Sequence, residues 1–369
     1  MTVGIVGAGQ LGRMLALAGY PLGLDFLFLD RSAGVPAAAL APLLVGEFTD
    51  RALLRQLARR CDVLSFDWEN ISVPELRAAM RGLRTRIAPP LRALATGQDR
   101  LAEKRLFERL GIPTTRYAAV GSRAALQRAA ARIGLPGVLK SRRLGYDGKG
   151  QQVIRDAAGL DAAWRALGGV PLLYEEFIPF DLEVSALGTR ARNGELALYP
   201  LTRNWHDEGI LRLSVAPWRA PALERQARRH LRAVLREFSY VGTLAIEFFV
   251  RRGRLIANEL APRVHNSGHW TIEGAVTSQF ENHLRAVAGL PLGSAAPLGH
   301  AAMINFIGIM PPAREVLGHP GVHLHDYGKA PRPGRKLGHC TLVAATARDR
   351  DLRTRRLLRS LHIARGAAP

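Results

Sequence analysis

The first thirty residues contain the feature that most constrains the fold, a short apolar run that ends in closely spaced glycines and continues as a helical pattern. The run TVGIVGAG is followed by QLGRMLALAGYPLG, so Gly7, Gly9 and Gly12 lie where a strand passes into a helix. A second apolar run, LDFLFLD, ends at Asp30. Glycines at such a turn allow close backbone approach and leave the helix N-terminus open to a ligand. The pattern predicts a βαβ unit with a parallel sheet.

This turn has three possible uses. Asp30 closes the second strand at the position where dinucleotide-binding enzymes keep the acid that binds the cofactor ribose. An NAD-dependent oxidoreductase is therefore one hypothesis. The glycines could instead let the first helix pack close to the sheet, or the helix N-terminus could receive another phosphate or polar ligand. The motif alone leaves these interpretations open.

Length, charge and cysteine usage narrow the class of protein. A chain of 369 residues predicts two or three domains. Only five of its 52 basic residues are lysines, and the arginines are scattered without interleaved aromatic residues. We therefore interpret the net charge of +21 as solvated helix faces, and we expect no nucleic-acid partner. We also expect no membrane span, no signal peptide and two reduced cysteines, which together predict a cytoplasmic protein.

The pattern of helices and strands changes twice along the chain. Strand and helix alternate up to about residue 98, and a second α/β unit follows a helix near residue 100. Strands dominate beyond about residue 181, and the tail from residue 300 resembles a small β-rich unit. We predict three domains, over residues 1–98, 99–295 and 296–369.

A second glycine-rich stretch, LGYDGKGQ, separates two predicted strands. Gly145, Gly148 and Gly150 free the backbone to aim several N–H groups at one anion, and Lys149 adds a mobile positive charge. Lys140 ends the preceding strand five residues before the loop, where it could pair with nucleotide phosphates. The stretch is not a Walker A loop, because it lacks the first glycine and the Ser or Thr after the lysine. The alternative is a plain hairpin turn.

Two carboxylates interrupt apolar strands, Glu247 in LAIEFFV and Glu259 in IANELAP. Burying a charge without a partner is costly. A hairpin through RRGR would make the two strands neighbours and bring the carboxylates side by side, where a cation would relieve their repulsion. Hard oxygen ligands beside a phosphate substrate indicate Mg²⁺, with Asn258 adjoining the site. The alternative is a pair of structural glutamates in salt bridges.

Three further stretches carry polar side chains beside apolar strands. The run APRVHNSGHW offers a guanidinium for a carboxylate or phosphate and several short donors. LLYEEF offers a carboxylate that could accept hydrogen bonds from a base or ribose, and GKAPRPGRKLGH offers cations for a second anion site. The residues concerned are Arg263, His265, Asn266, Ser267, Glu175, Glu176, Lys329, Arg335 and Lys336.

The lysine strand, the glycine-rich loop and the paired carboxylates together resemble an ATP-grasp enzyme. The segments GQLGRM, GYDGKGQ, YPLTRNWHDEGILRLSVAP, NELAPRVHNSGHWT and RPGRKLGH resemble the 5-(carboxyamino)imidazole ribonucleotide synthetase family of purine biosynthesis, over residues 1 to about 345. The resemblance implies an α/β ATP-grasp fold with an N-terminal Rossmann-like (pre-ATP-grasp) domain and a small C-terminal β-rich unit. It also implies a homodimer, and a lid over about 116–180 that is mobile without ATP.

The chemistry that the resemblance implies starts from ATP and bicarbonate, which form carboxyphosphate and ADP. Carboxyphosphate, or CO₂ released from it, then carboxylates the exocyclic amine of 5-aminoimidazole ribonucleotide. Mg²⁺, or Mn²⁺, would offset charge at the terminal phosphates. Sister ATP-grasp enzymes, such as a formyl-phosphate-using transformylase or a biotin carboxylase, are the nearer alternatives, and VHNSGHWT argues against both. NAD is then not expected.

The resemblance also assigns residues. Two of them depart from the family pattern: Phe177 stands where some relatives carry a small residue, and Lys149 stands where some carry arginine, which loses bidentate geometry. ATP is assigned to Arg100, Lys140, Gly145, Tyr146, Asp147, Gly148, Lys149, Gly150, Gln151, Glu175, Glu176, Phe177, Ile178, Glu183, His206, Asn258 and Glu259. The metal is assigned to Glu247 and Glu259, and catalysis to Lys149, Arg263, His265 and Asn266. The ribonucleotide and bicarbonate are assigned to Gln10, Leu11, Glu69, Tyr146, Asp147, Arg263, His265, Asn266, Ser267, Lys329, Arg335 and Lys336.

Overall fold

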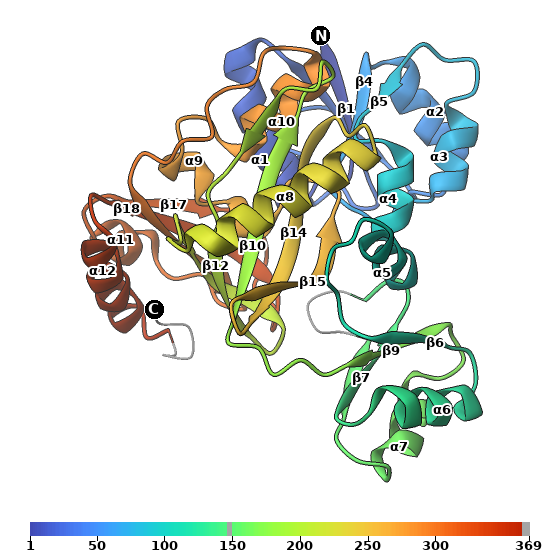
Figure 1. Cartoon of the computed structure of the whole chain (residues 1–369). Coiled ribbons are helices and arrows are strands. Elements are labelled where there is room, and N and C mark those ends of the chain that lie inside the picture. Colours follow the sequence, from blue (N-terminus) through green and yellow to red (C-terminus); the bar gives the residue numbers. More distant parts are fainter. Residues whose placement is uncertain (146–149, 364–369) are drawn as a thin grey trace.

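Three β-sheets organise the part of the chain that the computed structural model describes, residues 1–145 and 150–363 (Figure 1). The first sheet belongs to the N-terminal region, the second to a small unit in the middle of the chain, and the third to everything that follows. Among the described helices, none is long and apolar enough to cross a membrane. The observed architecture is the α/β fold that the sequence predicts.

The N-terminal sheet is parallel, with strand order β3-β2-β1-β4-β5. Its central strands are almost fully buried because helices cover both faces: α2 and α3 pack on one, and α1 packs with α10 (Gln279–Ala288) on the other. Side chains of Asp50 and Ser72 cap α2 and α3. The elements are β1 (Thr2–Val6), α1 (Gln10–Gly19), β2 (Asp25–Asp30), β3 (Leu43–Val45), α2 (Arg51–Arg59), β4 (Val63–Phe66), α3 (Val73–Ala79) and β5 (Arg86–Ile87).

Two consecutive helices, α4 (Leu91–Gly97) and α5 (Arg100–Arg109), lead to the four-stranded antiparallel sheet, which has the order β6-β9-β7-β8. Helices α6 and α7 cover one face of this sheet and form a separate apolar core with it (Figure 1, lower right). The expected helix near residue 100 ends at Arg109, ahead of Gly111, which adopts a positive φ of 64°. The remaining elements are β6 (Tyr117–Val120), α6 (Arg123–Ile133), β7 (Gly137–Ser141), β8 (Gln151–Ile154), α7 (Gly159–Leu167) and β9 (Leu172–Glu176).

The third sheet has nine strands, in the order β15-β14-β10-β12-β13-β16-β18-β17, with β11 paired to β10. Its strands are β10 (Leu182–Arg190), β11 (Leu196–Leu198), β12 (Thr202–Asp207), β13 (Ile210–Ala216), β14 (Gly242–Arg251), β15 (Arg254–Ala261), β16 (His300–Ile307), β17 (Val322–Asp326) and β18 (Lys336–Ala344). Its helices are α8 (Pro221–Glu237), α9 (Thr271–Gly274), α10 (Gln279–Ala288), α11 (Ala313–Leu317) and α12 (Ala347–Ser360).

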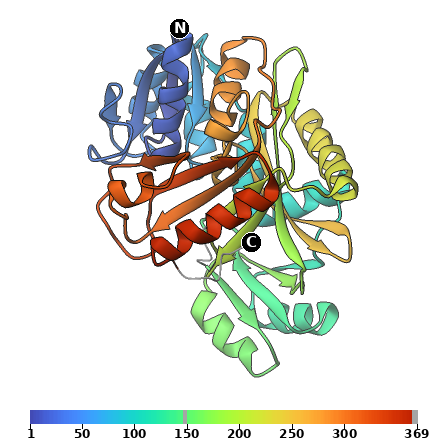
Figure 2. The same cartoon turned by 90° about the vertical axis from the view of Figure 1, so that its left-hand side faces the viewer.

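The strands of the C-terminal tail continue this sheet, because β16 pairs antiparallel with β13. Helix α12 packs across β16 and β18 (Figure 2). The β-rich tail that the sequence predicts is present, and it shares one hydrogen-bonded sheet with the strands before it. Helix α10 begins at Gln279, after the Ser278 side chain, which accepts the N–H of Glu281. The division into three domains at the expected boundaries stays a prediction.

Candidate active site

A cleft of about 1120 Å³ is lined by side chains from all three sheets. It opens where the carboxyl end of the N-terminal sheet, the inner strands of the four-stranded sheet and the β14–β15 hairpin face one another. The sequence-predicted residues that line it are Gln10, Leu11, Glu69, Arg100, Lys140, Gln151, Glu175, Glu176, Phe177, Ile178, Glu183, His206, Glu247, Asn258, Glu259, Arg263, His265, Asn266, Lys329, Arg335 and Lys336. Four predicted residues, Tyr146, Asp147, Gly148 and Lys149, lie outside the described residues.

The two strand carboxylates are cross-strand neighbours. Glu247 of β14 pairs directly with Glu259 of β15, and a β-bulge follows Glu247. Burial and the nearby charge of Glu259 raise the pKa of Glu247 to about 7, although His206 opposes the shift. The hairpin therefore brings two carboxylates together, as the sequence predicts. Within residues 1–145 and 150–363, no group of three or more His, Cys, Asp or Glu side chains is suited to hold a metal ion.

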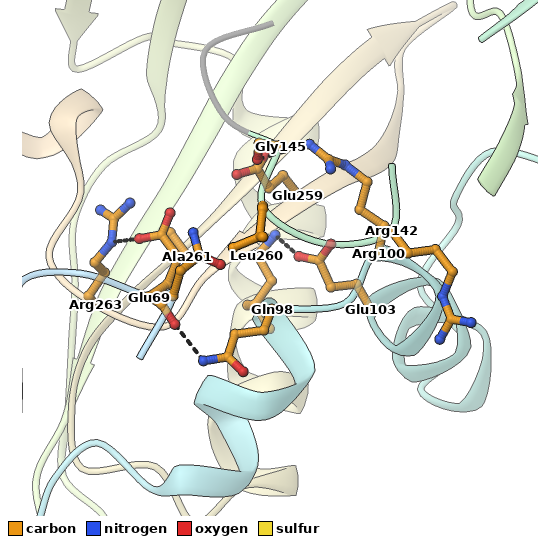
Figure 3. A pocket seen from close by; sticks show the side chains of 13 residues that line it. Glu69, Gln98, Arg100, Glu103, Arg142, Gly145, Glu259, Leu260, Ala261 and Arg263 are labelled. Atoms are coloured by element: carbon orange, nitrogen blue, oxygen red, sulfur yellow. Dashed lines mark hydrogen bonds and ion pairs between the residues drawn. The ribbon is translucent and has the colours of Figure 1, made fainter. Parts of the chain in front are cut away.

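A third carboxylate, which the sequence analysis missed, lies behind Glu259. Glu103 of α5 is only 2% exposed, and its Oε1 accepts a hydrogen bond of 2.8 Å from the backbone N–H of Leu260 (Figure 3). Burial, together with the charge of Glu259, raises the pKa of Glu103 to about 8. A cavity of about 20 Å³ beside it, which also borders Arg100 and Gly145, has room for about one water molecule.

On the side of the four-stranded sheet, Lys140 of β7 faces Glu175 of β9, with Nζ 3.2 Å from Oε1. Glu175 is 1% exposed, so it is not a surface charge. Its neighbour Glu176 forms a 3.0 Å ion pair with the exposed Arg116. The two carboxylates of LLYEEF therefore have different environments, and only Glu175 contacts the strand lysine.

In the third sheet, Glu183 Oε2 of β10 accepts a hydrogen bond from His206 Nδ1 of β12 at 2.8 Å. Burial opposes protonation of His206, but this contact and the charge of Glu247 raise its pKa. Phe177 and Ile178, which follow β9, line the same end of the cleft. This end combines apolar and charged walls.

The glycine turn of the N-terminal sheet holds a carboxylate of the chain itself. Asp67 is 8% exposed, and its Oδ2 accepts the N–H of Gly12 at 3.1 Å. A Cβ atom on Gly7 would stand 1.9 Å from Asp67 Oδ1, so the glycine is needed to make room for this side chain. Asp30 Oδ2 accepts the N–H of Ala8 at 2.7 Å. Because these carboxylates occupy the turn, the geometry favours the close-packing interpretation over a dinucleotide phosphate.

An ion pair joins the N-terminal unit to the segment after β15. Arg263 Nε donates to Glu69 Oε2, and the side chain of Gln98 donates to the backbone carbonyl of Glu69 at 2.6 Å (Figure 3). Burial opposes ionisation of Glu69, but the charge and the hydrogen bond of Arg263 outweigh it and lower the pKa of Glu69. The two residues are 194 positions apart in the sequence, so their pairing depends on the tertiary fold.

His265 is held by hydrogen bonds on several sides. Its backbone N–H donates to Gln279 Oε1 at 2.9 Å, and Gln279 Nε2 donates to its carbonyl at 2.6 Å. Its Nδ1 contacts Ser267 Oγ at 2.9 Å, and its Nε2 lies 3.5 Å from Glu247 Oε1. Burial, followed by the charge of Arg263, lowers the pKa of His265 well below its usual value, so the ring is neutral at pH 7.

Asn266 and Ser267, the two residues that follow His265, differ from each other in whether they line the cleft. Ser267 was expected to contact the substrate, but it is fully buried and contacts His265 instead of lining the cleft. Asn266 does line the cleft, and neither its side-chain nitrogen nor its oxygen has a hydrogen-bond partner among the described residues. A buried amide in this state is suited to a polar ligand.

The tail brings its basic residues to the first helix. Lys329 donates to Gln10 Oε1 and lies over the ring of Tyr327, 5.6 Å from the centroid. Burial, together with the charge of Arg335, lowers the pKa of Lys329 to about 8. Lys336, at the start of β18, lines the same part of the cleft. Cations from the end of the chain thus lie beside a side chain from its beginning.

Comparison with known proteins identifies this arrangement. Three family models match consecutive parts of the chain: the ribonucleotide synthetase preATP-grasp domain over residues 1–98, the ATP-grasp domain over 105–280 and the phosphoribosylaminoimidazole carboxylase C-terminal domain over 301–353. The N5-carboxyaminoimidazole ribonucleotide synthase of Pseudomonas aeruginosa is 53% identical over 345 residues, which are 94% of this chain and 95% of the relative. The chain belongs to the N5-carboxyaminoimidazole ribonucleotide synthase family.

Solved structures agree with this assignment to the synthase family. The N5-carboxyaminoimidazole ribonucleotide synthetase of Thermus thermophilus superposes with a TM-score of 0.92 at 50% identity, covering 97% of this chain and 98% of that one. The enzyme of Aspergillus clavatus in complex with ADP and 5-aminoimidazole ribonucleotide superposes with a TM-score of 0.91 at 29% identity, covering 98% and 99%. The predicted family, the α/β ATP-grasp fold with its pre-ATP-grasp domain, and the ligase class are confirmed.

Four residues near the cleft of this synthase-family chain were not found from its sequence: Asp67, Glu103, Lys104 and Gln279. Each is buried and acts on a neighbour that was predicted. Three of them stand in helical or turn patterns where a polar residue usually faces solvent. For Lys104 a signal did exist, because lysine is rare in this chain and the other four lysines all stand in stretches singled out for chemistry.

Proposed function

We propose that this chain converts 5-aminoimidazole ribonucleotide, ATP and bicarbonate into N5-carboxyaminoimidazole ribonucleotide, ADP and phosphate in the cleft described above. The observation that carries the proposal is the meeting, in one cleft, of the paired carboxylates on the β14–β15 hairpin with cations from both the four-stranded sheet and the tail. One end of the cleft suits a nucleoside triphosphate with its metal ion, and the other end suits a polar second substrate that carries a phosphate.

On the ATP side, Lys140 and Arg100 would face the phosphates, while Phe177 and Ile178 would line the adenine. Glu247 and Glu259 fit Mg²⁺ or Mn²⁺, since such ions in nucleotide sites use one or two carboxylates and take their other ligands from phosphates and water. When bound, the ion would neutralise charge on the terminal phosphates. The four-stranded sheet would close over the nucleotide as a lid and exclude water.

On the ribonucleotide side, Arg263 and Asn266 would hold the aminoimidazole and the bicarbonate. The unpartnered amide of Asn266 supports this role, and the neutral imidazole of His265 would act as a hydrogen-bonding group and not as a cation. Lys329, Arg335 and Lys336 would bind the ribonucleotide phosphate. These cations line the same cleft as Glu247 and Glu259, so a ribonucleotide held by its phosphate there could direct its amine toward the ATP side.

The chemistry follows from this orientation. A bicarbonate oxygen accepts the terminal phosphoryl group of ATP, which gives carboxyphosphate and ADP. The exocyclic amine nitrogen then attacks the carboxyl carbon, the bond from carbon to the phosphate oxygen breaks, and phosphate leaves with the proton that the amine loses. Arg263 would stabilise negative charge that develops on the carboxyl oxygens. We further propose a cytoplasmic homodimer with the three-domain division given above.

The test is ADP release by the purified chain with Mg-ATP and bicarbonate, measured with and without 5-aminoimidazole ribonucleotide. Strong stimulation by the ribonucleotide, with matching loss of its free amine and dependence on bicarbonate, is the expected result. ADP release that is indifferent to the ribonucleotide would contradict the substrate and point to a sister ATP-grasp enzyme. Glu259→Gln serves as the inactive control. It replaces one carboxylate oxygen of a proposed metal ligand with an amide nitrogen and preserves the side-chain shape.

A further inference from the structure

Lys104 is the lysine for which neither the motifs nor the proposed function gives a role. It lies on α5 and is 1% exposed, whereas Lys140, Lys329 and Lys336 line the cleft. A buried ammonium is costly unless its charge is paired and its donors are used. Its retention in a chain that otherwise uses arginine for positive charge calls for a specific contact.

The ammonium of Lys104 has a partner for each of its three N–H donors. Its Nζ lies 3.0 Å from Glu175 Oε2, 3.2 Å from the carbonyl oxygen of Asn258 and 3.4 Å from that of Ala257. Glu175 belongs to β9 of the four-stranded sheet, and the two carbonyls belong to β15, directly before the metal-side carboxylate Glu259. Lys104 therefore joins the two sheets between which the nucleotide would bind.

The two oxygens of Glu175 are used unequally. Oε2 accepts a 2.7 Å hydrogen bond from Thr115 Oγ1 in addition to its contact with Lys104. Oε1 lies 3.2 Å from Lys140 Nζ, yet it has no partner with hydrogen-bond geometry among the described residues. Lys104 and Thr115 thus anchor the carboxylate through Oε2, while the lysine beside the other oxygen is Lys140.

The group of Lys104, Lys140 and Glu175 carries a net charge of +1, because it contains two lysines and one carboxylate. Of the two lysines, Lys140 lines the cleft. We propose that Lys104 is a positioning residue for nucleotide binding: it holds and neutralises the Glu175 carboxylate, so that the charge and donors of Lys140 stay available to the nucleotide phosphates. This inference rests on the proposed function, which gives Lys140 its phosphate partner.

The titration behaviour agrees with this division of roles. Burial disfavours the charged form of Glu175, but Lys104 first and Lys140 second outweigh it and lower the pKa of Glu175 well below its usual value. Burial lowers the pKa of Lys140, and Glu175 opposes that change. Glu175 therefore favours the charged form of Lys140, and Lys104 takes up part of the negative charge that would otherwise pair fully with Lys140.

The first test removes the charge of Lys104. In Lys104→Met the carboxylate of Glu175 has Lys140 as its only lysine partner among the described residues, and the net charge of the group falls to zero. KM for ATP and Kd for Mg-ADP should rise by at least about tenfold, as for the loss of one charged contact, while KM for the ribonucleotide is unchanged. Arg116→Met is the control, because it removes an exposed positive charge beside the same sheet and should leave both constants within about twofold.

The second test restores the net charge without restoring the lysine. Adding Glu175→Gln to Lys104→Met returns the group to +1 and releases Lys140, so the double variant should bind Mg-ADP more tightly than Lys104→Met alone. A purely structural lysine predicts the opposite order, since the second substitution would add its own damage. If Lys104→Met does not fold, as judged by its thermal transition, Lys104→Gln replaces it, because glutamine keeps a donor for the buried acceptors.

The outcomes separate this inference from the proposed function. Wild-type protein without ribonucleotide-dependent ADP release would defeat the proposed function itself. A wild-type protein with that activity, combined with a double variant that binds Mg-ADP no better than the single variant, would overturn the role of Lys104. An equal rise in KM for the ribonucleotide and for ATP in Lys104→Met would also overturn it, because the effect would then not be confined to the nucleotide.

Discussion

Glu69→Gln should impair the use of the ribonucleotide and leave the use of ATP unchanged. The substitution removes one charge from the buried pair of Glu69 and Arg263 and keeps the side-chain shape. The side chains of Glu69 and Arg263 are 17% and 16% exposed, so water screens their contact little. A hydrogen bond between charged groups contributes about 1.5–3 kcal/mol, and we expect the free energy of unfolding at pH 7 to fall by about that amount. If the transition state loses the same free energy because Arg263 is no longer held in place, kcat/KM for 5-aminoimidazole ribonucleotide should fall roughly 10- to 150-fold.

The assays are chemical denaturation and steady-state kinetics with each substrate varied in turn. KM for ATP should not change, because the ion-pair partner of Glu69 is Arg263, which we propose binds on the ribonucleotide side. Glu75→Gln is the control: its pair with Arg51 is exposed, and both readouts should match the wild type. Unchanged kcat/KM for the ribonucleotide together with unchanged stability would refute the reasoning.

The pH dependence of Glu69→Gln gives an independent check. The pKa of Glu69 is lowered in the folded protein, so its stabilising contribution is complete above the unfolded carboxyl value of about 4.3 and is lost as the pH falls through the lower folded value. The difference in unfolding free energy between wild type and variant should be constant from pH 8 down to about 5 and should shrink below about 4. A difference that grows toward acid pH would contradict the ion pair.

Three shorter predictions concern other parts of the molecule. Glu259→Gln should abolish ATP turnover with an unchanged thermal transition, and an active, Mg²⁺-dependent variant would rule out the metal assignment. Lys336→Ala should raise KM for the ribonucleotide and leave KM for ATP unchanged; normal saturation by the ribonucleotide would count against it. Cys61 and Cys340 are buried, which raises the pKa of each thiol to about 12, so neither should react with iodoacetamide at pH 8 until the protein unfolds, and rapid labelling of folded protein would contradict this.

The parts of the site that the sequence predicted are those built from local patterns. The short link between β14 and β15 fixes an antiparallel hairpin, so the two carboxylates are expected near each other. Regular pairing from Arg251 and Arg254 would set Glu247 opposite Asn258, and the β-bulge after Glu247 brings Glu259 opposite it instead. The same holds for Lys140, because a strand that ends in a glycine-rich turn carries its last side chain to a predictable place. Local patterns therefore bring partners within one hairpin near each other, but they do not predict the bulge that decides which residues pair.

The parts that were missed depend on distant partners. Nothing near Asp67 in the sequence indicates that its carboxylate enters the glycine turn. Asp30 has the spacing of a ribose-binding acid, but its carboxylate accepts a hydrogen bond from the N–H of Ala8. Glu103 and Lys104 stand side by side in an otherwise charged helix, where the pattern indicates a solvated face. Their burial follows from the packing of α5 against β15, which no local pattern encodes.

The pairing of β13 with β16 has a consequence for how specificity can change in this family. Glu247 and Glu259, proposed for the metal, and Lys336, proposed for the ribonucleotide phosphate, are carried by one continuous sheet, from β14 and β15 to β18. If the C-terminal strands were replaced by those of another protein, the new strand beside β13 would have to pair with it in the same register. A shift of one residue would exchange the two faces of that strand. New acceptor substrates should therefore arise by point substitution within this sheet, and not by recombination of exchangeable modules.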